Sequence, residues 1–128
     1  MRDYLKTTLG MTEEDMARLP PNIMKMLAAA SRLMSKKVVA KCVKSKYCAA
    51  GIKEGDKAVF VRNVINQQET TAPLCMRGIA CLVTPVTQIM DLMINGLDTE
   101  IAISRIPCLD PGLDAGGLGR VVWEVSVE

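Results

Sequence analysis

Five cysteines and the absence of histidine define the chemistry open to this sequence. Three of the cysteines are each followed, three or four residues later, by a glycine: Cys48 in YCAAG, Cys75 in LCMRG and Cys108 in PCLDPG. Thiolate–metal sites use such turns, because backbone N–H groups can point at the sulfur and the metal must be approached closely. We therefore predict that these three thiols converge on an all-thiolate zinc or iron–sulfur site.

The other two cysteines receive different interpretations. Cys81 follows Cys75 by six residues and is a candidate fourth metal ligand, and Asp110 is a candidate carboxylate ligand. Cys42 lies in an alternating strand pattern, so we expect it to pack as a small hydrophobic side chain. The chain has no CxxC pair, and the spacing of its cysteines matches no standard zinc knuckle or ferredoxin. Buried, reduced thiols in a structural or interaction protein are therefore the first alternative.

A thiol-dependent enzyme is the second alternative. Without histidine the chain cannot form a Cys–His or Ser–His pair, so a general base would have to be a shifted Asp, Glu, Lys or Cys. A cysteine nucleophile could instead be activated by a nearby cation, and Lys46 and Arg77 are the candidates. The residues leave open whether the protein is an enzyme.

The stretch IPCLDPGLDAGGLGRVVWEV, residues 106–125, combines a cysteine and two aspartates with four glycines. A phosphate loop runs into the N-terminus of a helix, whereas the GGLG sequence here runs into an apolar strand pattern and lacks a following Lys-Ser or Lys-Thr pair. Asp110 and Asp114 supply too few oxygens for a calcium loop. We predict a turn in which one or more glycines adopt a positive φ.

Composition places the chain among folded globular proteins, since 49% of its 128 residues are hydrophobic and 23% are charged. Charged residues or proline interrupt each apolar run, so we predict no membrane-spanning segment. The first residues carry acidic side chains and lack the apolar segment of a secretion signal. We therefore expect a cytoplasmic protein with reduced thiols, and the odd number of cysteines also argues against a disulfide framework.

The net charge of +2 is unevenly distributed. Residues 36–62 contain eight basic and two acidic residues, whereas residues 63–128 contain three basic and eight acidic ones. Aromatic residues make up 3% of the chain, which leaves little for base stacking, and no predicted helix carries a row of Arg, Asn and Gln suited to reading a groove. We therefore expect no nucleic-acid partner and a basic face that meets solvent or an acidic protein surface.

Residues 1–36 are predicted to form a helical extension. Thr12 is a candidate N-cap, the prolines at 20–21 break the chain, and Asn22 is a candidate cap for a second helix with one apolar stripe. Nine methionines give the helices soft apolar surfaces that suit core packing or adaptable partners. The partner that we expect is a second copy of the chain or a larger protein subunit.

Residues 37–128 are predicted to form a compact α+β domain. Strand patterns cover residues 37–47, 57–62, 99–107 and 119–128, and a helical pattern begins at about residue 73. Pro85 lies inside that pattern, so we predict that a new helix starts there with Thr84 as its N-cap. The element order predicts a mostly antiparallel four-stranded sheet with helices packed on one face.

The segments KYCAAGIKEGDKAVF, APLCMRGIACL and IPCLDPGLDAGGLGRVVWEV also resemble a family of small prokaryotic proteins of unassigned function. The resemblance covers roughly residues 38–127 and leaves out the N-terminal helices. It implies that Cys48, Cys75 and Cys108 are the recurring positions of the pattern, together with the turn at residues 55–56. Many members pair a cysteine with proline near the first position, where this chain has alanine in YCAAG. The resemblance implies no activity.

Overall fold

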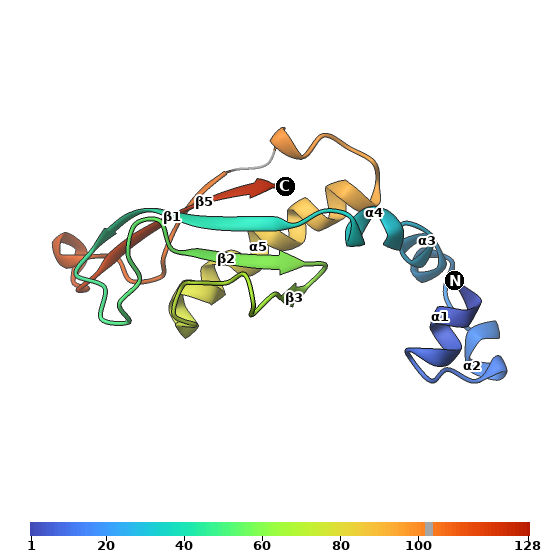
Figure 1. Ribbon diagram of the computed structural model, residues 1–128. Helices are drawn as coiled ribbons and strands as arrows, with labels where there is room; N and C mark the ends of the chain where they lie inside the picture. Colours follow the sequence, from blue (N-terminus) through green and yellow to red (C-terminus); the bar gives the residue numbers. More distant parts are fainter. Residues whose placement is uncertain (102–103) are drawn as a thin grey trace.

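A five-stranded antiparallel sheet with a long helix packed on it forms the body of the computed structural model, which describes residues 1–101 and 104–128 (Figure 1). The sheet order is β3-β2-β1-β5-β4. This confirms the predicted α+β class, with one strand more than the sequence patterns indicated. The strands are β1 (Val38–Lys46), β2 (Lys57–Val61), β3 (Val64–Ile65), β4 (Arg105–Pro107) and β5 (Arg120–Val127).

The central strand β1 pairs with β2 on one side and β5 on the other. Cys42 lies opposite Trp123, and both side chains are 1% exposed in the core. The predicted role of Cys42 as a small hydrophobic residue is therefore confirmed. Between Cys42 and Lys44 the register of β1 and β5 shifts by one residue, which marks a β-bulge.

The helix α5 (Met76–Ile94) runs along one face of the sheet as a single helix of 19 residues. The prediction that Pro85 starts a new helix is therefore wrong. Proline removes the backbone hydrogen bond to residue 81, but Pro85 itself is buried together with Leu82 and Val86 on the same apolar stripe. Burial of that stripe against the sheet compensates for the missing hydrogen bond and keeps the helix continuous.

Length and composition alone would let α5 cross a membrane. This differs from the expectation that charged residues and proline interrupt each apolar run. Seven of its residues are nevertheless buried inside the protein, including Leu82 at 1% and Ile89 at 2% exposure. A helix that packs in a protein core can thus match a membrane span in length and composition.

The predicted third strand is shorter than expected. Thr99–Ile101 form a turn of 3-10 helix, residues 102–103 lie outside the described part of the chain, and only Arg105–Pro107 pair with β5 as β4. The additional strand β3 follows β2 after a two-residue turn in which Arg62 has a φ of 55°. Two residues are too short to produce an alternating pattern in the sequence.

Four short helices precede the sheet: α1 (Arg2–Thr7), α2 (Glu13–Ala17), α3 (Pro21–Ala28) and α4 (Ala30–Met34). The predicted cap at Thr12 is confirmed, because its hydroxyl oxygen accepts a 3.1 Å hydrogen bond from the Asp15 backbone N–H. The predicted cap at Asn22 is wrong. The helix begins at Pro21, since proline fits the first helical position, and Pro20 takes the cap position.

The helix α4 packs on α5, so it belongs to the body of the molecule. Leu33 is 7% exposed and is part of the hydrophobic core, and Arg32 Nη2 donates a 2.9 Å hydrogen bond to the Ile94 carbonyl oxygen. The helices α1 and α2 extend beyond the end of the sheet (Figure 1). Leu33 and Arg32 thus join α4 to the body of the molecule, whereas the predicted division of the chain at residue 36 stays a prediction.

Candidate cysteine site

One pocket is lined by Cys48, Cys75 and Cys108, the three cysteines singled out in the sequence. Its volume is about 330 Å³, and all three cysteines are half-buried. Arg77 and Asp110 contribute the charged side chains. The other lining residues are small or apolar: Ala49, Ala50, Gly119 and Val121.

Each cysteine lies at the end of a different element. Cys48 follows β1 in a turn closed by a 3.1 Å hydrogen bond from the Gly51 N–H to the Cys48 carbonyl oxygen. Cys75 is the N-cap residue of α5, and Cys108 follows β4, where its N–H donates to the Val121 carbonyl oxygen at 2.8 Å. Three chain segments that are distant in sequence therefore meet in this pocket.

Two glycines let these segments approach. A Cβ on the buried Gly78 would lie 3.2 Å from Ile52 Cδ1, so glycine allows the first turn of α5 to lie close to the body of the domain. A Cβ on Gly119 would lie 2.7 Å from the Tyr47 carbonyl oxygen and 3.0 Å from Cys48 Cα. The glycine after Cys75 thus has a packing role, whereas the sequence suggested a role in directing N–H groups at sulfur.

The glycine-rich loop is a turn organised around Asp110. The Asp110 carboxylate accepts hydrogen bonds from the N–H groups of Gly112 (3.0 Å), Leu118 (3.0 Å) and Gly119 (2.9 Å). These bonds, with a smaller contribution from Arg77, lower the pKa of Asp110. Gly112 and Gly116 have φ values of 83° and 87°, which confirms the predicted turn with positive φ.

These hydrogen bonds limit what Asp110 can do in the pocket. A carboxylate that already accepts three backbone hydrogen bonds has few lone pairs left for a metal ion. The loop N–H groups are likewise occupied by a carboxylate of their own chain. The structure therefore gives Asp110 a structural role, and the pocket has three thiols and one guanidinium for binding a ligand.

Cys81, the candidate fourth ligand, is not among the residues that line the pocket. It lies on α5, and its thiol donates a 3.1 Å hydrogen bond to the Gly78 carbonyl oxygen. Burial raises the pKa of the Cys81 thiol to about 11, so it stays protonated at neutral pH. Burial also raises the pKa of the Cys42 thiol. Repulsion from the nearby thiols of Cys108 and Cys75 adds to the effect of burial on Cys81, which lies near the pocket but outside its lining.

The three pocket cysteines are close neighbours but do not form a complete metal site. Within residues 1–101 and 104–128, no group of three or more Cys, His, Asp or Glu side chains is placed to hold a metal ion. All five cysteines are free thiols. The structure thus supports the predicted convergence of three segments, whereas a metal ion remains a prediction.

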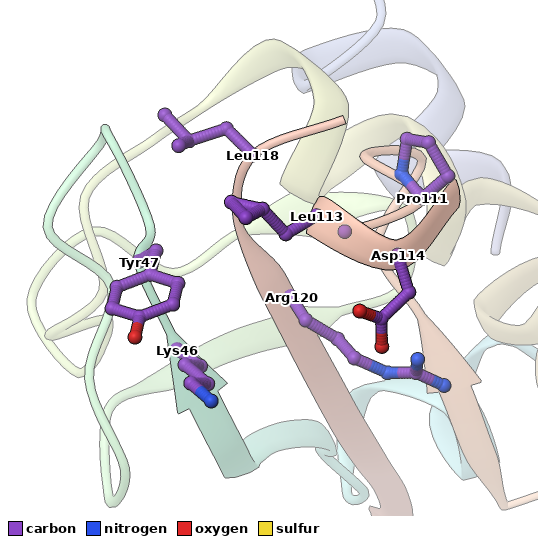
Figure 2. Close-up of a pocket in the computed structure, with 8 residues that line it drawn as sticks. Lys46, Tyr47, Pro111, Leu113, Asp114, Leu118 and Arg120 are labelled. Atoms are coloured by element: carbon purple, nitrogen blue, oxygen red, sulfur yellow. The ribbon is translucent and has the colours of Figure 1, made fainter. Parts of the chain in front are cut away.

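A second, smaller pocket of about 80 Å³ lies beside the glycine-rich loop, and the sequence patterns did not single it out. Its lining includes Lys46, Tyr47, Asp114 and Arg120. Figure 2 shows the Asp114 carboxylate close to the Arg120 side chain, with Lys46 and Tyr47 across from them. Lys46 Nζ lies 5.0 Å from the centroid of the Tyr47 ring. Each residue alone fits an ordinary polar surface, which explains why the sequence did not reveal the pocket.

Comparisons with protein families, with curated proteins and with solved structures give no match to this chain. The resemblance to small prokaryotic proteins therefore rests on the three cysteine-containing segments alone. What the protein does must be argued from its own residues.

Proposed function

We propose that this chain is a small binding module whose functional site is the cysteine pocket and whose ligand is held by the thiols of Cys48, Cys75 and Cys108. The observation that carries the proposal is the meeting of these three thiols in one pocket, although they follow or precede three different elements. Core cysteines such as Cys42 need no such arrangement, because packing alone explains them.

The donor set suits a soft metal ion such as Zn²⁺ or the iron of a cluster, since thiolates are the ligands that these metals favour. The positions of the donors do not yet form a coordination group. Metal binding would therefore require the turns that carry Cys48 and Cys108 to move toward Cys75. Such a site works with reduced thiols, which suits a reducing compartment such as the cytoplasm.

The test is a titration of anaerobically purified protein with Co²⁺ and then Zn²⁺, followed by absorption spectroscopy and elemental analysis. Thiolate ligation should give intense absorption from sulfur-to-cobalt charge transfer, which Zn²⁺ then removes. Serine at Cys48, Cys75 or Cys108 should abolish this absorption. The matched control is Cys81→Ser, which should preserve it, because the Cys81 side chain does not line the pocket. Absence of the absorption, or equal loss in Cys81→Ser, would contradict metal binding.

Arg77 favours a second candidate function, a thiol-dependent reaction. A guanidinium beside thiols attracts anions and stabilises thiolate, the nucleophilic form of cysteine. We expect iodoacetamide to alkylate one of the three pocket cysteines at least about tenfold faster than Cys81, whose pKa of about 11 keeps it protonated. Arg77→Gln should slow that one alkylation. Uniform rates at all cysteines would exclude this candidate.

A further inference from the structure

The face of the sheet opposite α5 gathers basic side chains from four strands. The register places Val38, Ala40 and Cys42 toward the core with α5, so the alternate positions of β1 face away from it. Val39 and its β2 partner Val59 are nevertheless buried on that opposite face, so its exposed part begins at Lys41. After the bulge that follows Cys42, Lys44 and Lys46 lie opposite Val122 and Arg120, on the face away from α5. The cations on this open face are Lys41, Lys44 and Lys46 of β1, Lys57 of β2, Arg120 of β5 and Arg105 of β4.

Few carboxylates balance these six cations. Glu124 pairs with Arg105, with Arg105 Nη2 3.1 Å from Glu124 Oε2, and Asp114 lies beside Arg120 in Figure 2. In the part of the chain that the structure describes, no ion pair involves the four lysines. Lys41, Lys44 and Lys46 are exposed and Lys57 is half-buried. The open face therefore carries an excess of about four positive charges.

This clustering follows from the fold. In the sequence, the six cations are spread between residues 41 and 120, which favours a solvated surface. Antiparallel pairing of β1 with β2 and β5 brings Lys41 opposite both Lys57 and Glu124, and brings Lys46 opposite Arg120. The sequence predicts no nucleic-acid partner because it has few aromatic residues for base stacking and no helix suited to reading a groove. Neither reason bears on contacts to phosphates alone, which need only clustered cations.

We propose that the open sheet face binds the phosphate backbone of double-stranded nucleic acid without reading its sequence. Lysines contact phosphates as flexible point charges, and such contacts dominate sequence-independent binding. Lysine is depleted at protein–protein interfaces, which favour aromatic residues, methionine and arginine. Phe60 and Trp123 face the core, so in the described part of the chain Tyr47, beside Lys46, is the one exposed aromatic ring near this face. A single ring cannot stack a run of unpaired bases. The observations thus favour a duplex over a protein partner or a single strand.

The proposal is independent of the cysteine pocket, because the three pocket cysteines lie outside the strands that form this face. A duplex of about 20 base pairs with a fluorescent label should bind the full-length protein, measured by anisotropy. Contacts to about four phosphates predict a slope near −4 when the logarithm of the binding constant is plotted against the logarithm of the salt concentration. The range to cover is about 50 to about 200 mM NaCl.

The decisive variant is Lys41→Gln/Lys44→Gln, which removes two exposed charges from the open face. It should bind about tenfold more weakly and reduce the slope to about −2. The matched control is Arg18→Gln/Lys25→Gln, which removes two exposed charges from the N-terminal helices and should bind like the unmodified chain. Circular dichroism of both variants checks that the fold is unchanged.

The proposal is overturned if the unmodified chain does not bind the duplex at low salt, or if both double variants lose the same affinity. It is also overturned if poly-glutamate binds the open face more tightly than the duplex does, because this would assign the face to an acidic protein partner. Tighter binding to a single strand than to the duplex would likewise contradict the choice of double-stranded nucleic acid.

Discussion

Asp110 is the residue on which the glycine-rich loop depends. Its carboxylate is hydrogen-bonded in the folded state, and its pKa there lies below the usual 3.8. A lowered folded-state pKa means that the carboxylate stabilises the fold above the unfolded pKa, and that this contribution is lost as the pH falls through the folded pKa. The stabilising effect should therefore be present at neutral pH and disappear in acid.

Asp110→Asn tests this with a side chain of the same size. The asparagine amide has only one oxygen to accept from the three N–H donors that the carboxylate binds. The variant should unfold at lower urea concentration than the unmodified chain at neutral pH. The difference between the two midpoints should shrink below about pH 4, where the unmodified carboxylate becomes protonated. Midpoints measured from neutral pH to about pH 2.5 check this, and a constant difference would contradict it.

Gly119 sets the distance between the loop and Cys48. Gly119→Ala would place a Cβ against the Tyr47 carbonyl oxygen and Cys48 Cα, which are backbone atoms that cannot rotate away. We expect a loss of about 1–3 kcal/mol in the free energy of unfolding and a changed alkylation rate at Cys48. Ala115→Ser, on the exposed part of the same loop, is the control and should change neither quantity.

At the scale of elements, α5 supplies much of the core. Leu82→Ala removes a side chain that is 1% exposed and should lower the free energy of unfolding by about 2–5 kcal/mol. Val83→Ala in the same helix removes a side chain that is 59% exposed, so its effect should stay below about 0.5 kcal/mol. Urea unfolding measures both variants. Similar losses would contradict the packing of α5 on the sheet.

Elements with long alternating or helical patterns could be predicted from the sequence. β5 was the clearest, since Val121, Trp123 and Val125 alternate with more exposed positions and are buried as expected. The continuity of α5 through Pro85 could not be predicted, because tertiary burial outweighs a local cost that the sequence does display. The two residues of β3 are positioned by pairing with β2, which no local pattern records.

At the scale of the whole molecule, the contacts of α4 with α5 lead us to predict that the stable unit begins before α4. Deleting residues 1–20 removes α1 and α2 together with the 3.1 Å hydrogen bond that Arg62 Nη1 donates to the Tyr4 hydroxyl, so it should lower the free energy of unfolding by only about 1 kcal/mol. Deleting residues 1–36 also removes Leu33 from the core and should cost about 2–5 kcal/mol, as loss of a buried leucine does. Equal stability of the two truncated proteins would show that α4 is dispensable.

The candidate site was predicted in part. A shared Cys–Gly context identified Cys48, Cys75 and Cys108, and the fold brings them to one pocket. The same reasoning could not show that Cys81 lies outside the lining of the pocket, because that depends on which face of α5 it occupies. The open basic face was missed for a related reason, since the partners of Lys41 and Lys46 across the sheet depend on strand register.

The three N–H groups that converge on Asp110 have one more consequence. They form a concave receptor for an anion, and the chain supplies that anion itself. Anions in the surrounding solution therefore meet a receptor that is already filled. Asp110→Ala would empty it, and acetate should then raise the unfolding temperature of this variant more than that of the unmodified chain. Removal of the Asp110 side chain would thus make the loop a binding site for small carboxylates.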